Sequence, residues 1–251
     1  MQHLFSAPGL AALRDTLARR PLLAFDFDGT LAPIVARHAD ARMPLPVARR
    51  LRALAQALPV AIVSGRSVAD IESRLDFAPR YIVGNHGAEH PFAVRDPGAS
   101  EALEPVRERL RTHARALVLA GVSVEDKQHS IALHYRLAPD REAAYRQITA
   151  LMQGLPSDVR VFGGKMVVNL AAARAPDKAQ AVLALVQQAG AAAAVFVGDD
   201  LNDEPVFVSA PASWLTVRVG RDDASSQAMF GLDHFQEVAG MLDHMLALVR
   251  G

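Results

Sequence analysis

The sequence predicts an α/β fold built on a parallel sheet, with a smaller α+β domain inserted into it. Short apolar runs alternate with helical patterns over residues 22–87 and again after residue 173, and this alternation indicates parallel strands joined by right-handed crossovers. Between about residues 92 and 173 the strand candidates follow one another in pairs, which is typical of an antiparallel sheet. We therefore expect a core of residues 1–91 and 174–251 and an inserted domain of residues 92–173.

The composition indicates a soluble globular protein whose partners are small molecules. The 251 residues are 51% hydrophobic, and 27 basic and 27 acidic side chains give a formal net charge of zero. A neutral chain offers no electrostatic surface for nucleic acid or for an anionic membrane. Cysteine is absent, which excludes disulfides and thiolate metal sites. Because the first residues also lack the apolar segment of a targeting signal, we expect a cytoplasmic location.

The core elements follow from apolar runs and helix-start signals. Nearly continuous apolar runs are expected of strands buried on both faces of a parallel sheet, and prolines at 44 and 46 are typical of a helix start. In the first part of the core we expect helices at 10–19, 44–57 and 68–75, and strands at 22–27, 60–63 and 81–83. In the second part we expect a helix beginning at Lys178, strands at 194–197 and 214–219, and a helix at 235–249.

The inserted domain should contain two helices and paired strands. The patterns predict helices at 101–119 and 141–152 and strands at 122–125, 131–137, 159–162 and 165–170. Successive side chains of a strand point to opposite faces of the sheet. We therefore expect Asn169 to point the same way as Lys165, while Met166, Val168 and Leu170 pack inward.

Two carboxylates end the first apolar run, LLAFDFDGTL. Asp26 and Asp28 precede the turn signal Gly29-Thr30, so they should emerge at the C-terminal edge of the sheet, where open α/β sheets place their active sites. A carboxylate within an apolar run is costly unless it finds a partner or a metal. One carboxylate can attack phosphorus while a second protonates the leaving alcohol and activates water. The pair therefore predicts phosphoryl transfer through an aspartyl-phosphate, with Mg²⁺ to screen the anions.

Three later features supply groups suited to this chemistry. Ser64 and Gly65 follow the second strand and precede a helix, where a hydroxyl and backbone N–H groups can bind phosphate oxygens. Lys178 stands in the first turn of a helix, where the helix dipole disfavours a cation and an external anion would favour it. The run GDDLNDE contains four acids in six residues, which repel one another unless a cation compensates them.

Taken in order, DFDGT, Ser64 in VSGR, Lys178 and GDDLNDE resemble the four motifs of the haloacid dehalogenase superfamily of phosphohydrolases. Further stretches resemble the trehalose-6-phosphate phosphatases: GNHGAE at 84–89, VEDK at 124–127, ALHYR at 132–136, GKMVV at 164–168, DKA at 177–179 and VGDDLNDE at 197–204. The resemblance implies a Rossmann-like parallel-sheet core with an inserted α+β cap of the C2 type that sets substrate specificity. It also implies Mg²⁺-dependent hydrolysis of trehalose 6-phosphate.

The resemblance assigns roles residue by residue. It implies that Asp26 is the nucleophile and Asp28 the general acid and base, and that Ser64, Gly65 and Lys178 bind the phosphate. The metal-site residues that it implies are Asp26, Asp28, Asp199, Asp200 and Asp203. The substrate-binding residues that it implies are Arg66, His86, Gly87, Glu125, Lys127, Lys165 and Asn169. We expect His134 to be structural.

The chain departs from the family pattern in the inserted domain. The family usually has an acidic residue where this chain has Asn169, followed by a basic residue and a proline where this chain reads Leu170-Ala171-Ala172. Both departures concern the sugar rather than the phosphoryl chemistry. Two alternatives stay open: a related phosphatase acting on sucrose 6-phosphate, mannosyl-3-phosphoglycerate or a hexose phosphate, and a non-catalytic protein that binds a sugar phosphate. Binding alone does not require Asp28, which argues against the second.

Overall fold

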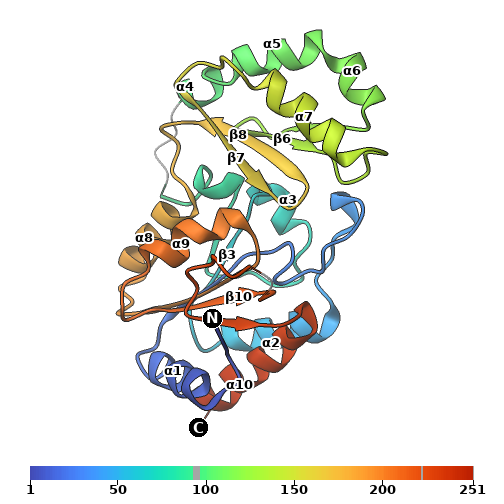
Figure 1. Ribbon diagram of the computed structural model, residues 1–251. Helices are drawn as coiled ribbons and strands as arrows, with labels where there is room; N and C mark the ends of the chain where they lie inside the picture. The colour runs from blue at the N-terminus through green and yellow to red at the C-terminus, as the bar shows by residue number, and fades with distance from the viewer. Residues whose placement is uncertain (93–96, 222, 251) are drawn as a thin grey trace. The chain divides into compact units, whose positions relative to one another are not determined.

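The computed structural model (Figure 1) describes residues 1–92, 97–221 and 223–250. The chain divides into two compact units: unit 1 consists of residues 1–92 and 176–251, and unit 2 of residues 93–175. The expected boundary near residue 92 borders residues 93–96, which lie outside the described residues. Each unit has its own sheet and its own apolar core.

Unit 1 is built on a seven-stranded parallel sheet with the order β1-β11-β10-β9-β2-β3-β4 (Figure 1). Its strands are β1 Gln2–His3, β2 Leu22–Phe25, β3 Val60–Val63, β4 Tyr81–Val83, β9 Ala194–Gly198, β10 Leu215–Val219 and β11 Phe230–Leu232. From β2 the chain adds β3 and β4 on one side, and it later adds β9, β10 and β11 on the other. The strand order therefore reverses between β2 and β9, and open α/β sheets bind their ligands at such a switch point.

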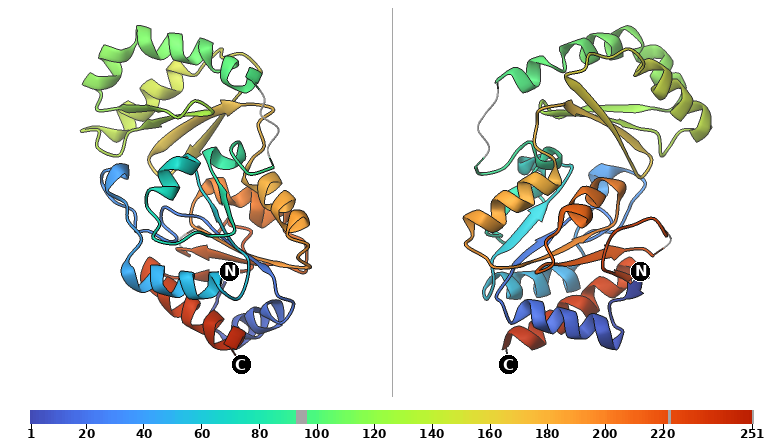
Figure 2. Two further views of the ribbon diagram at one scale, coloured as in Figure 1. Left: turned by 180° about the vertical axis from the view of Figure 1, so that it is seen from behind. Right: turned by 60° about the vertical axis from the view of Figure 1, so that its left-hand side comes forward.

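Helices cover both faces of this sheet, which explains why every residue of β2, β3 and β9 is buried (Figure 2). The helices α1 Ala7–Leu17, α2 Leu45–Ala55 and α10 Val238–Arg250 contribute to one apolar core, together with side chains such as Phe25, Ile62 and Val197 of the sheet. The helices α8 Lys178–Gln188 and α9 Glu204–Ser209 pack against the alternate side chains, such as Ala24 and Phe196. This two-sided burial requires the apolar runs that the sequence displays.

Short helical segments complete unit 1 at the loops that follow the strands. These segments are α3 Val68–Glu72 and the 3₁₀ turns η1 His38–Asp40, η2 Asn85–Gly87, η3 Leu201–Asp203 and η4 Phe235–Glu237. Three of them, α3, η2 and η3, directly follow β3, β4 and β9 in the chain. They therefore lie at the C-terminal edge of the sheet, where the sequence places the acidic pair.

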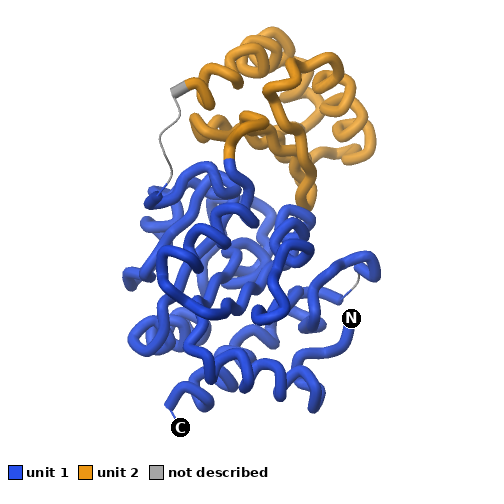
Figure 3. The backbone as a smooth tube through the Cα atoms, turned by 90° about the vertical axis from the view of Figure 1, so that its left-hand side faces the viewer, with its two compact units in different colours: residues 1–92, 176–251 blue, residues 93–175 orange. Residues whose placement is uncertain are grey.

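Unit 2 is a four-stranded antiparallel sheet with the order β5-β6-β8-β7 and helices on one of its faces (Figure 3, orange). The strands are β5 Ser123–Asp126, β6 Ser130–His134, β7 Val159–Gly164 and β8 Val167–Ala172. The helices are α4 Pro97–Glu101, α5 Glu104–Thr112, α6 Ala114–Leu119 and α7 Arg141–Leu151. Alternate strand residues, such as Leu133 and Leu170, pack with Val106 and Ile148 of the helices. The parallel core and this α+β unit confirm the predicted fold class.

Several elements differ from the expectations. The expected helix at 101–119 is divided into α5 and α6 at His113, whose backbone leaves the helical region and whose ring nitrogen Nδ1 lies 2.9 Å from the carbonyl oxygen of Arg109. The strand expected at 165–170 begins at Val167, because Lys165 and Met166 form the tight turn between β7 and β8. Strands β1 and β11 were not predicted.

The turn at Lys165 and Met166 corrects the expected side-chain pattern. Met166 has a positive φ of 61° and is 40% exposed, so it does not pack inward. Lys165 lies in the turn and shares no strand face with Asn169. Val168 and Leu170 do pack inward, as expected.

Across the described ranges, no helix combines the length and the apolar character needed to cross a membrane.

Candidate active site

Asp26 lies directly after β2 and is held beside β9. Its backbone N–H donates to the carbonyl of Val197 at 2.8 Å, which continues the parallel pairing of the two strands. The side chain of Asp26 is 7% exposed. The sheet therefore carries this carboxylate to its C-terminal edge at the point where the strand order reverses.

Lys178 joins the ends of β2 and β9 through two buried ion pairs. Its Nζ donates to Oδ1 of Asp26 and to Oδ1 of Asp203, each at 2.7 Å, and all three side chains are buried. Asp177 caps the N-terminus of α8 and forms a reciprocal capping box with Gln180, which places Lys178 at the first helical position. The anion expected near this lysine is thus found in the protein itself, as two carboxylates.

Burial and charge act on these groups in opposite directions. Burial raises the pKa of Asp26 well above its usual value; Lys178 partly offsets this, while Asp203 and Asp199 raise the pKa further. Burial lowers the pKa of Lys178, but the attraction of Asp203 and Asp26 outweighs it, and the net pKa is raised. The lysine is therefore firmly cationic, and the carboxylates around it are crowded with negative charge.

Three carboxylates form a cluster suited to a divalent cation. One oxygen from each of Asp26, Asp199 and Asp203 lies within 4.8 Å of the others, and all three residues are buried. Oxygen ligands of this kind are those that Mg²⁺ prefers. Three carboxyl groups face one ammonium here, so a divalent cation could supply the positive charge that Lys178 alone does not provide.

The loop after β9 orders these carboxylates through its own backbone. Oδ2 of Asp203 accepts the N–H groups of Asp199 and Asp200, both at 3.0 Å. The carboxylate of Asp200 instead accepts from the N–H of Leu201 at 2.8 Å and from the amide of Asn202 at 3.2 Å. Asp203 therefore links the loop to Lys178, while Asp200 shapes the η3 turn.

Gly29 allows the turn after β2 to lie against the loop after β9. Its φ is +89°, and a Cβ at this position would overlap the carboxylate of Asp199. The neighbouring Thr30 donates its hydroxyl to Oδ1 of Asp199 at 3.4 Å. The Gly29-Thr30 pair thus positions Asp199, a role that the reading of this pair as a turn signal did not reveal.

The turn after β3 is locked by the loop after β4. Ser64 is 1% exposed, and its Oγ accepts the N–H of Arg66 at 3.2 Å. The N–H of His86 donates to the carbonyl of Ser64 at 3.0 Å, and the ring of His86 occupies the space that a Cβ on Gly65 would need. Ser64, Gly65 and His86 therefore form one packed unit at the sheet edge.

This loop adopts a strained backbone that reaches the start of α8. Asn85, His86 and Gly87 have φ values of 50°, 58° and 114°, a region costly for the first two residues. Glu89 secures the loop, because its Oε2 accepts from the amide of Asn85 at 2.8 Å and from the N–H of Val68 at 3.0 Å. Gly87 lies so close to the Asp177 carbonyl that a Cβ would overlap it. The loop thus couples the Ser64 turn to the helix that carries Lys178.

Asp28 and Arg66 form a pair of their own. The guanidinium of Arg66 donates from Nε and Nη2 to the two carboxylate oxygens of Asp28, at 2.6 and 2.8 Å. Asp70 accepts a further bond from Arg66 at 2.8 Å. The sequence did not reveal these pairings, because nothing in the motif VSGR identifies the carboxylates that its arginine meets.

The expected sugar-binding residues of unit 2 lie either on strands, as Glu125 and Asn169 do, or in the connections between strands, as Lys127 and Lys165 do. Glu125 on β5 pairs in register with Ala132 on β6, and Ala132 pairs with Asn169 on β8. Cross-strand partners share a face, so Glu125 and Asn169 lie on the face opposite the helices, with a small residue between them. Oε2 of Glu125 lies 3.0 Å from Nε2 of His134 and 3.6 Å from Nζ of Lys127.

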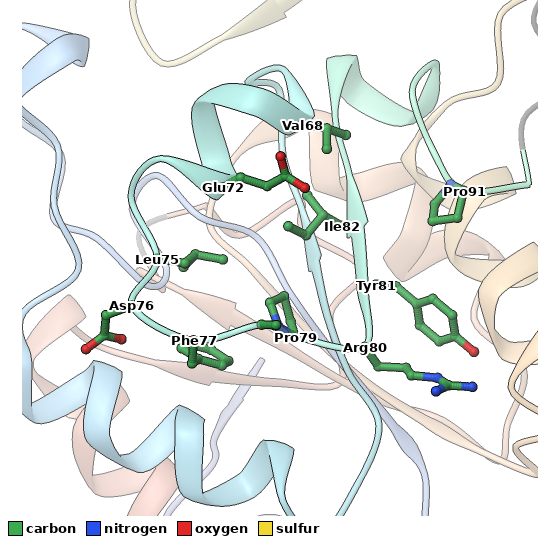
Figure 4. A pocket seen from close by; sticks show the side chains of 11 residues that line it. Val68, Glu72, Leu75, Asp76, Phe77, Pro79, Arg80, Tyr81, Ile82 and Pro91 are labelled. Atoms are coloured by element: carbon green, nitrogen blue, oxygen red, sulfur yellow. The ribbon is translucent and has the colours of Figure 1, made fainter.

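A separate pocket of about 560 Å³ lies beside β4 and the loop that precedes it (Figure 4). It is lined by Val68, Glu72, Leu75, Asp76, Phe77, Ala78, Pro79, Arg80, Tyr81, Ile82 and Pro91. None of these is among the site residues expected from the sequence.

Comparisons with known proteins agree with this geometry. The model of the family described as Trehalose-phosphatase matches residues 24–228. An uncharacterized glycosyl hydrolase of Mycobacterium tuberculosis is 35% identical over 202 residues, which cover 75% of this chain and 15% of that protein. A trehalose-phosphate phosphatase of Mycobacterium bovis is 32% identical over 267 residues, covering 100% of this chain and 68% of that protein. This chain thus spans only a small part of the first of these relatives and about two thirds of the second.

The fold itself also has a solved counterpart. The structure of the C-terminal domain of C. albicans trehalose-6-phosphate phosphatase superimposes with a TM-score of 0.83 at 22% identity, covering 98% of each chain.

The close approach at Gly29 generates a stability prediction. Gly29→Ala should lower the free energy of unfolding by at least about 1 kcal/mol more than Gly190→Ala, because overpacking adds to the cost of a positive φ. Gly190 is the matched control: its φ is +62°, but a Cβ there meets nothing within 4 Å. Urea denaturation of the two variants measures the difference, and equal losses would show that the Asp199 contact is not tight.

Proposed function

The chain belongs to the trehalose-phosphatase family, and on that basis we propose that it hydrolyses trehalose 6-phosphate to trehalose and phosphate. The observation that carries the proposal is the buried carboxylate of Asp26 at the switch point of the sheet, bonded to Lys178 and beside Asp199 and Asp203. A carboxylate so placed is costly to the fold, and phosphoryl transfer is the chemistry that uses it.

In the first step Asp26 attacks the phosphorus atom of the substrate. Lys178 engages Oδ1 of Asp26, which leaves Oδ2 to form the new bond. The ester bond between phosphorus and the sugar oxygen breaks as that bond forms, and Asp28 donates its proton to the departing oxygen. Trehalose leaves with this proton, and the phosphoryl group remains on Asp26.

In the second step Asp28, now a carboxylate, takes a proton from water. The oxygen of this water attacks phosphorus, the bond to Oδ2 of Asp26 breaks, and phosphate is released. Asp28 again holds a proton, so both carboxyl groups return to their starting states. The two acids of DFDGT thus perform different tasks because one is buried against Lys178 and the other is part-exposed.

Phosphate recognition follows from hydrogen-bond donors at the same edge. An ammonium has three N–H donors, and Lys178 gives two of them to Asp26 and Asp203, so one is left for a phosphate oxygen. The Oγ of Ser64 accepts the N–H of Arg66, so its hydrogen can be donated to phosphate. The resemblance of VSGR to the second motif of the superfamily also implies a phosphate-binding role for Gly65.

Asp26, Asp199 and Asp203 would hold Mg²⁺, with the backbone carbonyl of Asp28 as a further oxygen ligand and Asp200 ordering the loop. When bound, the ion supplies the positive charge that lets an anionic carboxylate approach an anionic phosphate. Lys178 alone cannot balance the three carboxylates, so we expect the protein to require the metal for turnover.

The sugar would be recognised by polar groups of unit 2. Glu125, Lys127, Lys165 and Asn169 offer the charged and amide groups that hydroxyl-rich ligands need, and His86 and Gly87 lie beside the phosphate-binding turn. The departure at Asn169 is the feature that favours testing other sugar phosphates, such as sucrose 6-phosphate, beside trehalose 6-phosphate.

The proposed nucleophile is tested by Asp26→Asn, which should reduce phosphate release to the level of the enzyme-free control. The amide keeps the shape of the carboxylate but cannot form the phosphoryl-enzyme. Asp15→Asn is the matched control, since Asp15 on α1 is exposed and pairs only with Arg14 among the described residues. Near-normal activity of Asp26→Asn, or full activity of the unaltered protein in EDTA, would refute the mechanism.

The sugar assignment is tested by Asn169→Glu, which should lower KM for trehalose 6-phosphate about fivefold while kcat changes little. A carboxylate accepts a sugar hydroxyl more strongly than an amide does. The Nδ2 of Asn169 has no hydrogen-bond partner among the described residues. Replacing the amide by a carboxylate therefore removes no hydrogen bond donated by this nitrogen.

Asn169→Gln controls for side-chain length in this test and should show no gain. A higher KM in Asn169→Glu, together with a better substrate among the other sugar phosphates, would show that trehalose 6-phosphate is the wrong substrate. The phosphatase assignment would survive that result.

A further inference from the structure

Arg66 presents a rigid guanidinium to Asp28. The pair is bidentate, with Nε to Oδ2 at 2.6 Å and Nη2 to Oδ1 at 2.8 Å, and this geometry is the strongest that arginine offers to a carboxylate. The side chain of Arg66 is 8% exposed, whereas that of Asp28 is 35% exposed. The buried partner is therefore the arginine, and the more exposed partner is the carboxylate that docks onto it.

The position of Arg66 does not depend on Asp28. Nη1 donates to Asp70 at 2.8 Å, and Nη2 also donates to the carbonyl of His38 at 2.6 Å. The guanidinium carbon lies 5.7 Å from the centre of the Phe27 ring, within the range of a cation–π contact. Burial disfavours the charge of Arg66, but the bonds to Asp28 and Asp70 outweigh it and raise its pKa.

A second arginine fixes the carboxylate that anchors Arg66. Arg74 donates to both oxygens of Asp70, at 2.9 and 2.7 Å, and to the carbonyl of Ala41 at 2.7 Å. Burial raises the pKa of Asp70, but the bonds from Arg74 and Arg66 outweigh it and lower that pKa to about 2. Asp70 thus stays ionised, and the order Arg74–Asp70–Arg66–Asp28 forms a chain of ion pairs that ends at the reacting acid.

We propose that Arg66 is the positioning residue of Asp28, docking its carboxylate so that the acid enters the reaction from one defined orientation. The inference rests on the proposed function, in which Asp28 protonates the leaving oxygen. In the docked pair both oxygens of Asp28 accept N–H groups, so this pair is the carboxylate form that takes a proton from water in the second step. In the acid form of the first step Oδ1 would carry the proton and leave Nη2. Releasing Oδ1 alone would leave Nε bonded to Oδ2 and Nη2 bonded to the His38 carbonyl, so Arg66 can stay in place while Asp28 turns.

This role differs from the substrate-binding role expected from the motif. An arginine that binds the phosphate contributes equally to both substrates, and an arginine that binds the sugar lowers KM for the sugar phosphate without changing kcat. An arginine that positions the general acid matters only when the leaving group needs a proton. A sugar alkoxide needs one, whereas 4-nitrophenolate leaves readily without one.

The test measures kcat, KM and kcat/KM for trehalose 6-phosphate and for 4-nitrophenyl phosphate. The value of kcat/KM for each substrate reports the steps up to formation of the phosphoryl-enzyme. Arg66→Ala should lower the value for the sugar phosphate about 100-fold, the contribution typical of general acid catalysis, and the value for the aryl phosphate much less. Arg66→Lys, which keeps the charge but not the bidentate geometry, should fall between. Guanidinium ion added to Arg66→Ala should partly restore sugar phosphate turnover, relative to sodium chloride at equal ionic strength.

Arg74→Ala is the matched control. Arg74 is as buried as Arg66 and binds the same Asp70, but its bonds go to Asp70 and to loop carbonyls rather than to Asp28. Its loss should discriminate between the two substrates far less than Arg66→Ala does, because Asp70, the His38 carbonyl and the Phe27 ring still hold the guanidinium of Arg66. Equal losses in Arg66→Ala, or a raised KM with unchanged kcat, would overturn the positioning role.

Asp28→Asn separates failure of this inference from failure of the proposed function. If Asp28→Asn shows the leaving-group effect and Arg66→Ala does not, Arg66 does not position the acid and the mechanism stands. If Asp28→Asn spares the sugar phosphate, the general acid is misassigned and the positioning role falls with it, while the hydrolysis of the sugar phosphate stands.

Discussion

A single buried ammonium between two buried carboxylates constrains the whole core. Lys178 contacts Asp26 and Asp203 at 2.7 Å each, with all three side chains almost free of solvent. Removing one partner from such a group leaves an uncompensated buried charge, at a cost of about 3–5 kcal/mol. The end of β2, the start of α8 and the loop after β9 must therefore meet at one point. A parallel sheet whose order reverses between β2 and β9 brings them there.

Close backbone approaches make this meeting possible. Gly29 lies against Asp199, and Gly198 lies against the side chain of Asp203, so neither position has room for a Cβ. Gly87 packs on the carbonyl of Asp177, which caps the helix that carries Lys178. These glycines belong to the motifs DFDGT, VGDDLNDE and GNHGAE, so the motifs carry packing constraints as well as reactive groups. The third carboxylate, Asp199, adds negative charge that the lysine cannot balance, which makes a divalent cation the natural complement.

Features that depend on a short stretch of sequence could be predicted, whereas features that depend on residues far apart in the chain could not. The strands β2, β3 and β9 were predictable because burial on both faces requires continuous apolar runs. Strands β1 and β11 were not, because Gln2–His3 contains no apolar residue and Gly231 interrupts Phe230–Leu232, and both strands pair only with distant parts of the chain. The turn at Lys165 and Met166 was hidden because Met166 is an apolar residue at a positive φ. The pairing of Arg66 with Asp28 joins residues 38 positions apart, so the motif indicated a cation at the site but could not identify its partner.

The central claim, that Asp26 becomes phosphorylated, is tested most directly by trapping the intermediate. The protein is quenched with acid during turnover of trehalose 6-phosphate in the presence of Mg²⁺ and reduced with borohydride, which converts an aspartyl-phosphate to homoserine. Its peptides are then sequenced by mass spectrometry. Homoserine is expected at position 26, and only when substrate and metal are both present. Homoserine at another aspartate, or unmodified aspartate throughout a sample that releases phosphate, would contradict it.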